Sequence, residues 1–264
     1  MSNRDRRLHS VLIDTHAHLD FDDFDVDRDE VLERAGKAGI ETVIIPGIDV
    51  ATSRKAVELA SRSDMLYAAV GIHPNSVRAA EPGDNVRIAR LAQEGNVCAI
   101  GEIGLDFYRD RTPREDQVRA FRGQLSLARE LDLPVIIHFR DVEQDGVDMT
   151  GQEHLAEVRG VFHCYGGSVG FAETVLNLGY YIGFDGPLTY PKSDRVDVAR
   201  TVPLERIVVE TDAPFLAPQT MRGKRNEPSY VTEVVRALAE IKHVDIGEVE
   251  EVTTRNARRL FGIT

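Results

Sequence analysis

The sequence predicts an α/β protein that folds as one TIM (β/α)8 barrel, and three observations lead to this prediction. Eight short apolar runs recur along the chain, and amphipathic stretches separate them. The length of 264 residues suits a barrel, which typically has about 250 residues. An open doubly wound sheet is the alternative, because strands and helices alternate in that fold too.

The predicted strands are runs of β-branched and aliphatic residues with little polar alternation. This pattern is typical of parallel strands that are buried on both faces. In chain order the runs are "VLIDT" (11–15), "TVIIPG" (42–47), "LYAAVGI" (66–72), "VCAIGEI" (97–103), "LPVIIHF" (133–139), "GVFHCY" (160–165), "YYIGFDG" (180–186) and "RIVVETD" (206–212).

The predicted helices are stretches in which apolar residues recur at helical spacing, so that they form one stripe. The first ends at Gly39, a helix stop, and a later one opens with the capping residue Ser168. The clearest stretches are 28–39, 114–132, 168–179, 228–242 and 247–260.

The chain shows no Pro-rich or Ser-rich linker, so we expect a single domain over residues 1–264, with residues 1–10 as a flexible N-terminal tail. These first residues lack the apolar stretch of a signal peptide, and no apolar run reaches membrane-spanning length. The two cysteines, Cys98 and Cys164, form no Cys-x-x-Cys pair. We therefore read them as small buried residues and expect a cytoplasmic protein.

The charge balance limits the class of partner. Thirty-two basic and 44 acidic residues give a formal net charge of −12. This balance argues against a broad basic face that grips duplex nucleic acid, whereas a local cationic contact in a cleft stays open. We expect no membrane partner and a monomer.

Residues that bind cations close five of the eight runs. In a barrel, the chemistry lies at the C-terminal ends of the strands, so these run ends share one rim. The residues are His16 and His18 after the first run, Glu102 in the fourth, His138 in the fifth, His163 in the sixth and Asp212 in the eighth.

Side-chain parity supports convergence of these residues. Residues i and i+2 of a strand face the same side, so His16 and His18 point the same way, about 6 to 7 Å apart along the backbone. By the same parity, Cys98 and Ile100 share the inner face with Glu102. Buried ionisable groups are costly unless they are paired or bound to metal. Any one of these residues alone could be a satisfied polar side chain, but six on one rim favour a cation site.

Four imidazoles and two carboxylates are too many ligands for one tetrahedral ion. They suit two ions about 3.5–4 Å apart with a bridging carboxylate. We expect Glu102 to bridge, His16, His18 and Asp212 to hold one ion, and His138 and His163 to hold the other. Mixed nitrogen and oxygen ligation admits Zn, Mn, Fe, Co or Ni, and Mg could also support activity. Two such ions point to hydrolysis, with Asp212 orienting the water and taking its proton.

The ordered motifs of the chain resemble a known family. "DTHAHLD", "GIHP", "GEIGLDFYRD", "PVIIHFRD", "GVFHCYGGS", "VETDAPFLAP" and "RGKRNEPSYV" follow one another from about residue 12 to the end. Together they resemble the TatD family of metal-dependent deoxyribonucleases, within the amidohydrolase superfamily. Glu102 stands where other branches of that superfamily place a carboxylated lysine, which favours TatD over the branches that cleave amides and lactones.

The resemblance implies a TIM barrel, a divalent-metal site made of the same six residues and cleavage of DNA phosphodiester bonds, often as an exonuclease on single strands or frayed ends. Three features depart from the family pattern, namely Phe139, Asn75 and the segment "VEQDGVDMTGQEH" (142–154). They touch the substrate side, so they leave the substrate more open than the metal site.

Further residues are predicted to contact substrate. His73 ends the third run on the same rim, and Arg140 follows His138. In the basic stretch "MRGKRNEP" (221–228), three cations are candidates for phosphate contacts, namely Arg222, Lys224 and Arg225. Each of these cations could instead belong to a solvated salt bridge. Asp14 and Glu210 share the inward parity and are candidates to orient the ligands, whereas Tyr108 could be rim packing or a base-stacking surface.

The leading hypothesis is therefore a two-metal deoxyribonuclease. A second enzyme hypothesis keeps both ions but cleaves a small phosphoester, lactone or amide, and the acidic net charge favours it. A third hypothesis is a barrel that binds DNA or a protein partner, with metals that serve only structure.

Overall fold

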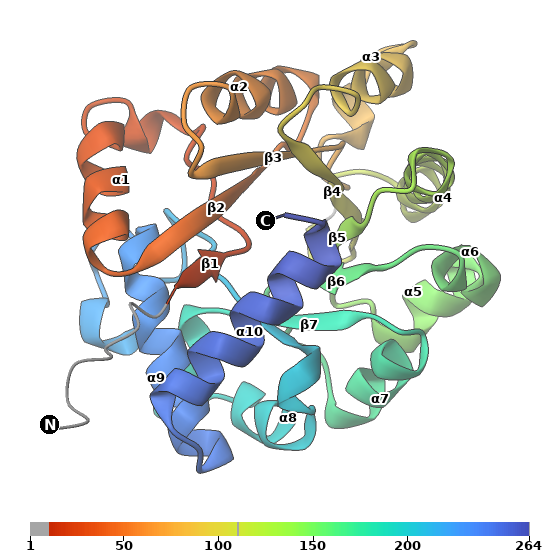
Figure 1. The fold of residues 1–264 in the computed structure, drawn as a ribbon. Helices are drawn as coiled ribbons and strands as arrows, with labels where there is room; N and C mark the ends of the chain where they lie inside the picture. The colour runs from red at the N-terminus through yellow and green to blue at the C-terminus, as the bar shows by residue number, and fades with distance from the viewer. Residues whose placement is uncertain (1–10, 110, 264) are drawn as a thin grey trace, which may run out of the picture.

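Eight parallel strands form the centre of the molecule and helices surround them (Figure 1). The structure is a computed structural model that describes residues 11–109 and 111–263. Each strand pairs with its neighbour in chain order, from β1 to β8. The TIM barrel prediction is confirmed and the open sheet is excluded. The predicted flexible tail, residues 1–10, lies outside the described residues.

Each predicted apolar run contains or overlaps one strand of the described structure. Several strands are shorter than their runs, so the candidate ligands on the first, sixth and eighth runs lie just beyond a strand end. The strands are β1 (Leu12–Asp14), β2 (Ile40–Pro46), β3 (Leu66–Val70), β4 (Val97–Asp106), β5 (Val135–Arg140), β6 (Gly160–Phe162), β7 (Tyr181–Phe184) and β8 (Ile207–Val209).

The five helices expected from the sequence are present, and five more lie within the described ranges. Gly39 follows the first helix with a φ of 89°, which an L side chain rarely adopts, and Ser168 accepts a hydrogen bond from the Phe171 amide at 3.2 Å. The helices are α1 (Arg28–Lys37), α2 (Val50–Ala60), α3 (Asp84–Leu91), α4 (Arg114–Leu131), α5 (Glu143–Thr150), α6 (Gln152–Ala156), α7 (Val169–Asn177), α8 (Arg195–Thr201), α9 (Val231–Lys242) and α10 (Ile246–Phe261).

Two apolar clusters hold the barrel together. The larger lies between the strands and the surrounding helices. The smaller fills the inside of the ring, where Ile13, Ile136 and Val208 meet Leu260 and Phe261 of α10. Figure 1 shows α10 lying across one end of the ring. Because α10 closes the end where the strands begin, a site for chemistry can form only at the end where the strands finish.

The parity prediction is wrong at one position of β4. Ile100 packs in the outer cluster with Ile137, whereas Cys98 packs inside the ring. The pairing of β3 with β4 shifts register between Val97 and Ala99, and the pairing of β4 with β5 shifts between Ile100 and Ile103. Each shift interrupts the alternation, so Ile100 faces outward and the inner face resumes at Glu102.

The eighth seam of the barrel, between β8 and β1, is closed by hydrogen bonds that continue past the ends of both strands. The amide of Thr15 donates to Val209 at 3.1 Å, that of Asp212 to His16 at 2.8 Å and that of His18 to Ala213 at 2.7 Å. These bonds place the first and last strand ends side by side. In the described part of the chain, no helix is long and apolar enough to cross a membrane.

Candidate metal centre

The first group of candidate ligands lies at the β8–β1 seam. The Nε2 atoms of His16 and His18 are 3.2 Å apart, and each lies 3.5–3.7 Å from Oδ1 of Asp212. Oε2 of Glu102 approaches the same two nitrogens at 3.6 and 3.7 Å. Ligand atoms of a tetrahedral ion with bonds near 2.1 Å are about 3.4 Å apart. The four side chains therefore have the spacing of ligands around one cation.

The second group lies on the other side of Glu102. Nδ1 of His138 and Nε2 of His163 are 3.1 Å apart, and each lies 2.9 Å from Oε1 of Glu102. The two oxygens of one carboxylate thus face two separate groups of imidazoles. This is the arrangement that the sequence predicts for a bridging carboxylate.

Local backbone features hold Glu102 and His138 in place. The Glu102 amide donates to the carbonyl of Gly47, which directly follows β2, at 2.8 Å. Gly104 has a φ of 140°, and a Cβ there would lie 2.1 Å from the carbonyl oxygen of His138. Only glycine allows β4 and β5 to approach so closely after Glu102.

The electrostatics of the site favour a bound cation. Burial lowers the pKa of His18 to about 4 and lowers that of His16 well below its usual value, so both imidazoles are neutral, which is the form that binds metal. Burial would raise the pKa of Glu102, but the surrounding imidazoles, His163 foremost, hold it well below its usual value. Burial and the Glu102 charge raise the pKa of Asp212 well above its usual value. A divalent cation would supply the positive charge that the Asp212 carboxylate lacks.

A buried carboxylate that the sequence interpretation missed supports His138. Oδ2 of Asp106 lies 3.5 Å from Nε2 of His138 and accepts a hydrogen bond from Asn75 at 2.8 Å. Oδ1 accepts from the amides of Tyr108 and Arg109. The sequence did not predict a role for Asp106 because the predicted strand ends at residue 103, whereas β4 continues to Asp106. A buried acidic residue four positions after Glu102 was the signal that could have identified it.

Glu210 and Asp14 lie behind the ligands, as the parity of their strands suggested. Oε1 of Glu210 lies 3.7 Å from Nδ1 of His163, and the same atom accepts a hydrogen bond from the Cys164 amide. Asp14 acts on the backbone instead, because it accepts from the amides of His16 at 3.2 Å and Thr211 at 3.0 Å. Asp14 therefore ties together the two chain segments that carry His16 and Asp212.

The predicted substrate contacts are distributed unevenly. Nε2 of His73 lies 3.4 Å from Oε1 of Glu102, so His73 adjoins the second group of ligands. The Arg140 guanidinium lies 4.0 Å over the Tyr108 ring, and that of Arg222 lies 5.1 Å over the Tyr190 ring. Both remain predictions for phosphate contact, as does Lys224, which is exposed.

Arg225 has a partner that the sequence did not suggest. Its guanidinium donates two hydrogen bonds to Asp27, at 2.8 and 2.7 Å, and lies 4.5 Å over the Phe24 ring. A phosphate contact by Arg225 would have to compete with this pair.

Beside Asp212 lies a buried group that the sequence interpretation did not foresee. Arg195 of α8 pairs with Asp185, and its Nη2 is 3.7 Å from Sγ of Cys164. Burial raises the pKa values of both thiols, Cys98 and Cys164, so they stay protonated. The prediction of small buried residues is confirmed for Cys98, whereas Cys164 is partly exposed.

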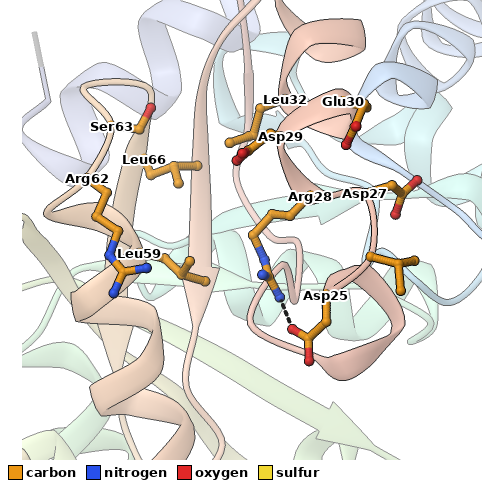
Figure 2. A pocket seen from close by; sticks show the side chains of 11 residues that line it. Asp25, Asp27, Arg28, Asp29, Glu30, Leu32, Leu59, Arg62, Ser63 and Leu66 are labelled. Atoms are coloured by element: carbon orange, nitrogen blue, oxygen red, sulfur yellow. Dashed lines mark hydrogen bonds and ion pairs between the residues drawn. The ribbon is translucent and has the colours of Figure 1, made fainter.

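A surface pocket lies away from this centre, in the helical outer layer (Figure 2). It is lined by α1, the end of α2 and the loops beside them. Its charged side chains pair locally, as Arg28 does with Asp25 at 2.5 Å. None of the candidate ligands lines it, so the donor set, and not this pocket, identifies the site.

Comparisons with known proteins point to one family. A family model described as "TatD related DNase" matches residues 13–262. The chain is 40% identical, over 96% of its length and 100% of the relative, to an uncharacterized metal-dependent hydrolase, YabD, of Bacillus subtilis. It is 33% identical, over 96% of its length and 100% of the relative, to a protein of Erwinia tasmaniensis named 3'-5' ssDNA/RNA exonuclease TatD.

The solved structures agree as well. A crystal structure of YjjV, a TatD homolog from Escherichia coli K12, matches with a TM-score of 0.89 and 32% identity, over 96% of this chain and 98% of that one.

Proposed function

Because the chain belongs to the TatD-related DNase family of metal-dependent hydrolases, we propose that it is a deoxyribonuclease that cleaves phosphodiester bonds in DNA with two divalent ions. The observation that carries the proposal is the position of Glu102, whose two carboxylate oxygens face two separate groups of ligands. In this proposal His16, His18 and Asp212 hold one ion, and His138 and His163 hold the other.

When bound, two such ions lower the pKa of water and stabilise negative charge on the phosphoryl oxygens. The protein supplies the proton acceptor. The Asp212 side chain is 14% exposed, against 4% for that of Glu102, so Asp212 is the more accessible carboxylate. It is placed to orient the attacking water and to accept its proton, while Glu102 holds the two ligand groups together.

We propose single-stranded DNA or frayed ends as the substrate. A chain with a net charge of −12 can hold a polyanion only through local cations. Arg140 is exposed at the end of β5, and Arg222 and Lys224 are exposed in the loop region after β8. The relative from Erwinia tasmaniensis is named for action on single-stranded DNA and RNA, which supports an unpaired substrate. We keep the expectation of a monomer, which light scattering can test.

The second candidate function is hydrolysis of a small phosphoester, lactone or amide at the same centre. The acidic charge favours it, and the relative at 40% identity is named only as a metal-dependent hydrolase. Salt separates the two candidates, because binding of a polyanion weakens steeply as salt rises, whereas turnover of a small neutral ester would not.

The experiment is a panel of Zn, Mn, Mg, Ni, Co and Fe on single-stranded, duplex and damaged DNA, with a small phosphodiester and a lactone as controls. Glu102→Ala should abolish cleavage, because it removes the bridging carboxylate. Glu58→Gln, an exposed glutamate on α2, is the matched control and should match the unmodified protein. DNA cleavage by Glu102→Ala at the unmodified rate would contradict the proposal, and a lactone cleaved faster than any DNA would favour the second candidate.

A further inference from the structure

Two exposed aromatic side chains stand beside the candidate metal centre. Among the large hydrophobic residues that are exposed in the described ranges, the aromatic ones are Tyr108 and Phe215, at 61% and 50% exposure. Both follow the C-terminal end of a strand that carries candidate ligands. Single exposed apolar residues need no explanation, but Phe215 has apolar neighbours.

Phe215 is part of an aromatic wall on the Asp212 side of the centre. Phe21 stacks on the ring of His18, with centroids 4.6 Å apart and planes 17° apart. Phe215 meets Phe21 edge-on at 6.0 Å and His18 at 6.3 Å. Leu216, 38% exposed, extends the apolar surface. We call Phe21 and Phe215 the aromatic wall, and Leu216 adjoins it.

The backbone that carries Phe215 is firmly held. The buried side-chain amide of Asn226 donates to the carbonyls of both Thr211 and Phe215, at 2.8 and 2.7 Å. The backbone amide of Asn226 donates to the carbonyl of Pro214 at 3.1 Å. Phe215 is therefore an exposed ring on a fixed support, which lowers the entropy that a binding partner must remove.

The same contacts join the segment of Phe215 to the basic stretch (221–228). Asn226 is part of that stretch, and Arg222 and Lys224 lie four and two positions before it in the chain. A ligand at this place would meet an apolar π surface, cations and a metal-type centre together. A nucleotide offers a flat base to the ring and a phosphate to the other two. An apolar peptide would leave the cations and the centre unused.

We propose that Phe215, backed by Phe21, is the surface on which the nucleobase next to the scissile phosphate stacks. The inference rests on the proposed nuclease function and deepens it. Every base has a π face, so stacking tolerates any sequence. It also requires a base that is free of its complementary strand, which gives a physical reason for a preference for single strands and frayed ends.

The experiment compares Phe215→Ala, Phe215→Leu and Phe215→Tyr on a single-stranded oligonucleotide, with the metal that best supports cleavage. Loss of one stacking ring should raise KM by about 5- to 150-fold in Phe215→Ala, and to a similar extent for each of the four terminal bases. Phe215→Tyr should stay near the unmodified protein. Phe215→Leu keeps an apolar side chain without a π face and should fall between them.

Two controls separate stacking from a general structural effect. The first is a substrate whose terminal nucleotide lacks its base, together with a small phosphodiester that has no base. All variants should cleave these two at nearly equal rates. The second is Ile246→Ala, which removes a side chain of similar exposure, 46%, at the start of α10 and should change nothing.

The outcomes are distinct. If the unmodified protein cleaves oligonucleotides and Phe215→Ala has the same KM, the inference is wrong while the proposed function stands. A loss of equal size on the base-free substrates would also overturn it, because the ring would then act on the centre and not on a base. If the unmodified protein cleaves no oligonucleotide, the proposed function itself fails and the stacking role fails with it.

Discussion

Replacing Asp106 by asparagine should weaken the second group of ligands selectively. Asp106 is 1% exposed, and its Oδ2 lies 3.5 Å from Nε2 of His138, the nitrogen that faces away from Glu102. A carboxylate in this position fixes the orientation of the ring and increases its basicity as a ligand. Asparagine keeps the shape and one carbonyl acceptor but removes the charge, so the change tests orientation and charge and not packing.

The size of the effect follows from what Asp106 holds. Loss of such a supporting partner typically costs about 10- to 100-fold in metal affinity, which corresponds to about 1.4 to 2.8 kcal/mol. The upper end is expected here, because Asp106 also accepts hydrogen bonds from Asn75 and from the amides of Tyr108 and Arg109. The first group should keep its affinity, since neither His16 nor His18 contacts Asp106.

The assay is a calorimetric titration of metal-free protein with a divalent ion. Two binding steps should be seen, and only one should weaken in Asp106→Asn. The matched control is Asp49→Asn at the start of α2. It removes a carboxylate that accepts a hydrogen bond from the Thr52 amide at 2.8 Å. That change should lower thermal stability and leave both binding steps unaltered. Equal weakening of both steps, or of neither, would refute the supporting role of Asp106.

Two further predictions concern charges around the site. Arg222→Ala and Lys224→Ala should each reduce the salt dependence of single-strand binding, by about 0.7 in the slope of log affinity against log salt. Arg225→Ala should leave this slope unchanged, because Arg225 already pairs with Asp27. A filter-binding assay in which only Arg225→Ala changes the slope would contradict this prediction. Burial would raise the pKa of Glu227, but hydrogen bonds from Arg34 and Ser229 hold it below its usual value. The ionised carboxylate therefore stabilises the folded protein above pH 4.5, and this contribution is lost as the pH falls through the lowered pKa. Glu227→Gln should thus lower the free energy of unfolding by about 1 kcal/mol at pH 7 and by progressively less toward pH 3, as chemical denaturation of metal-free protein can show.

The strands and the six candidate ligands could be read from the sequence for one physical reason. Strands buried on both faces must be apolar, so a His or Asp that ends such a run stands out, as Asp212 does after "RIVVE". The barrel then brings all strand ends to one rim, whichever residues fill the loops between them. The convergence of His16, Glu102 and His138 needs only the fold and the strand order.

Features that depend on exact register or on distant partners could not be read in this way. The side on which Ile100 packs depends on a register shift near the start of β4, which leaves no clear mark in an apolar run. Asp106 was missed because "LD" after "GEIG" does not look like strand. The pairing of Arg225 with Asp27 joins residues 198 positions apart, and no local pattern reports such a contact.

The barrel seam and the candidate metal centre depend on the same hydrogen bonds. Between β8 and β1, the bonds that close the ring are donated by the amides of Asp212 and His18 and by that of Thr15. A shift at this seam would therefore move His16, His18 and Asp212 together. Glu102 would stay in place, because its amide is hydrogen-bonded to Gly47, just after β2. An ion held by all four side chains would join the seam to β4 on another part of the ring. His16, His18 and Asp212 thus lie on the segments that close the barrel, whereas Glu102, the proposed bridging carboxylate, is held by a different part of the ring.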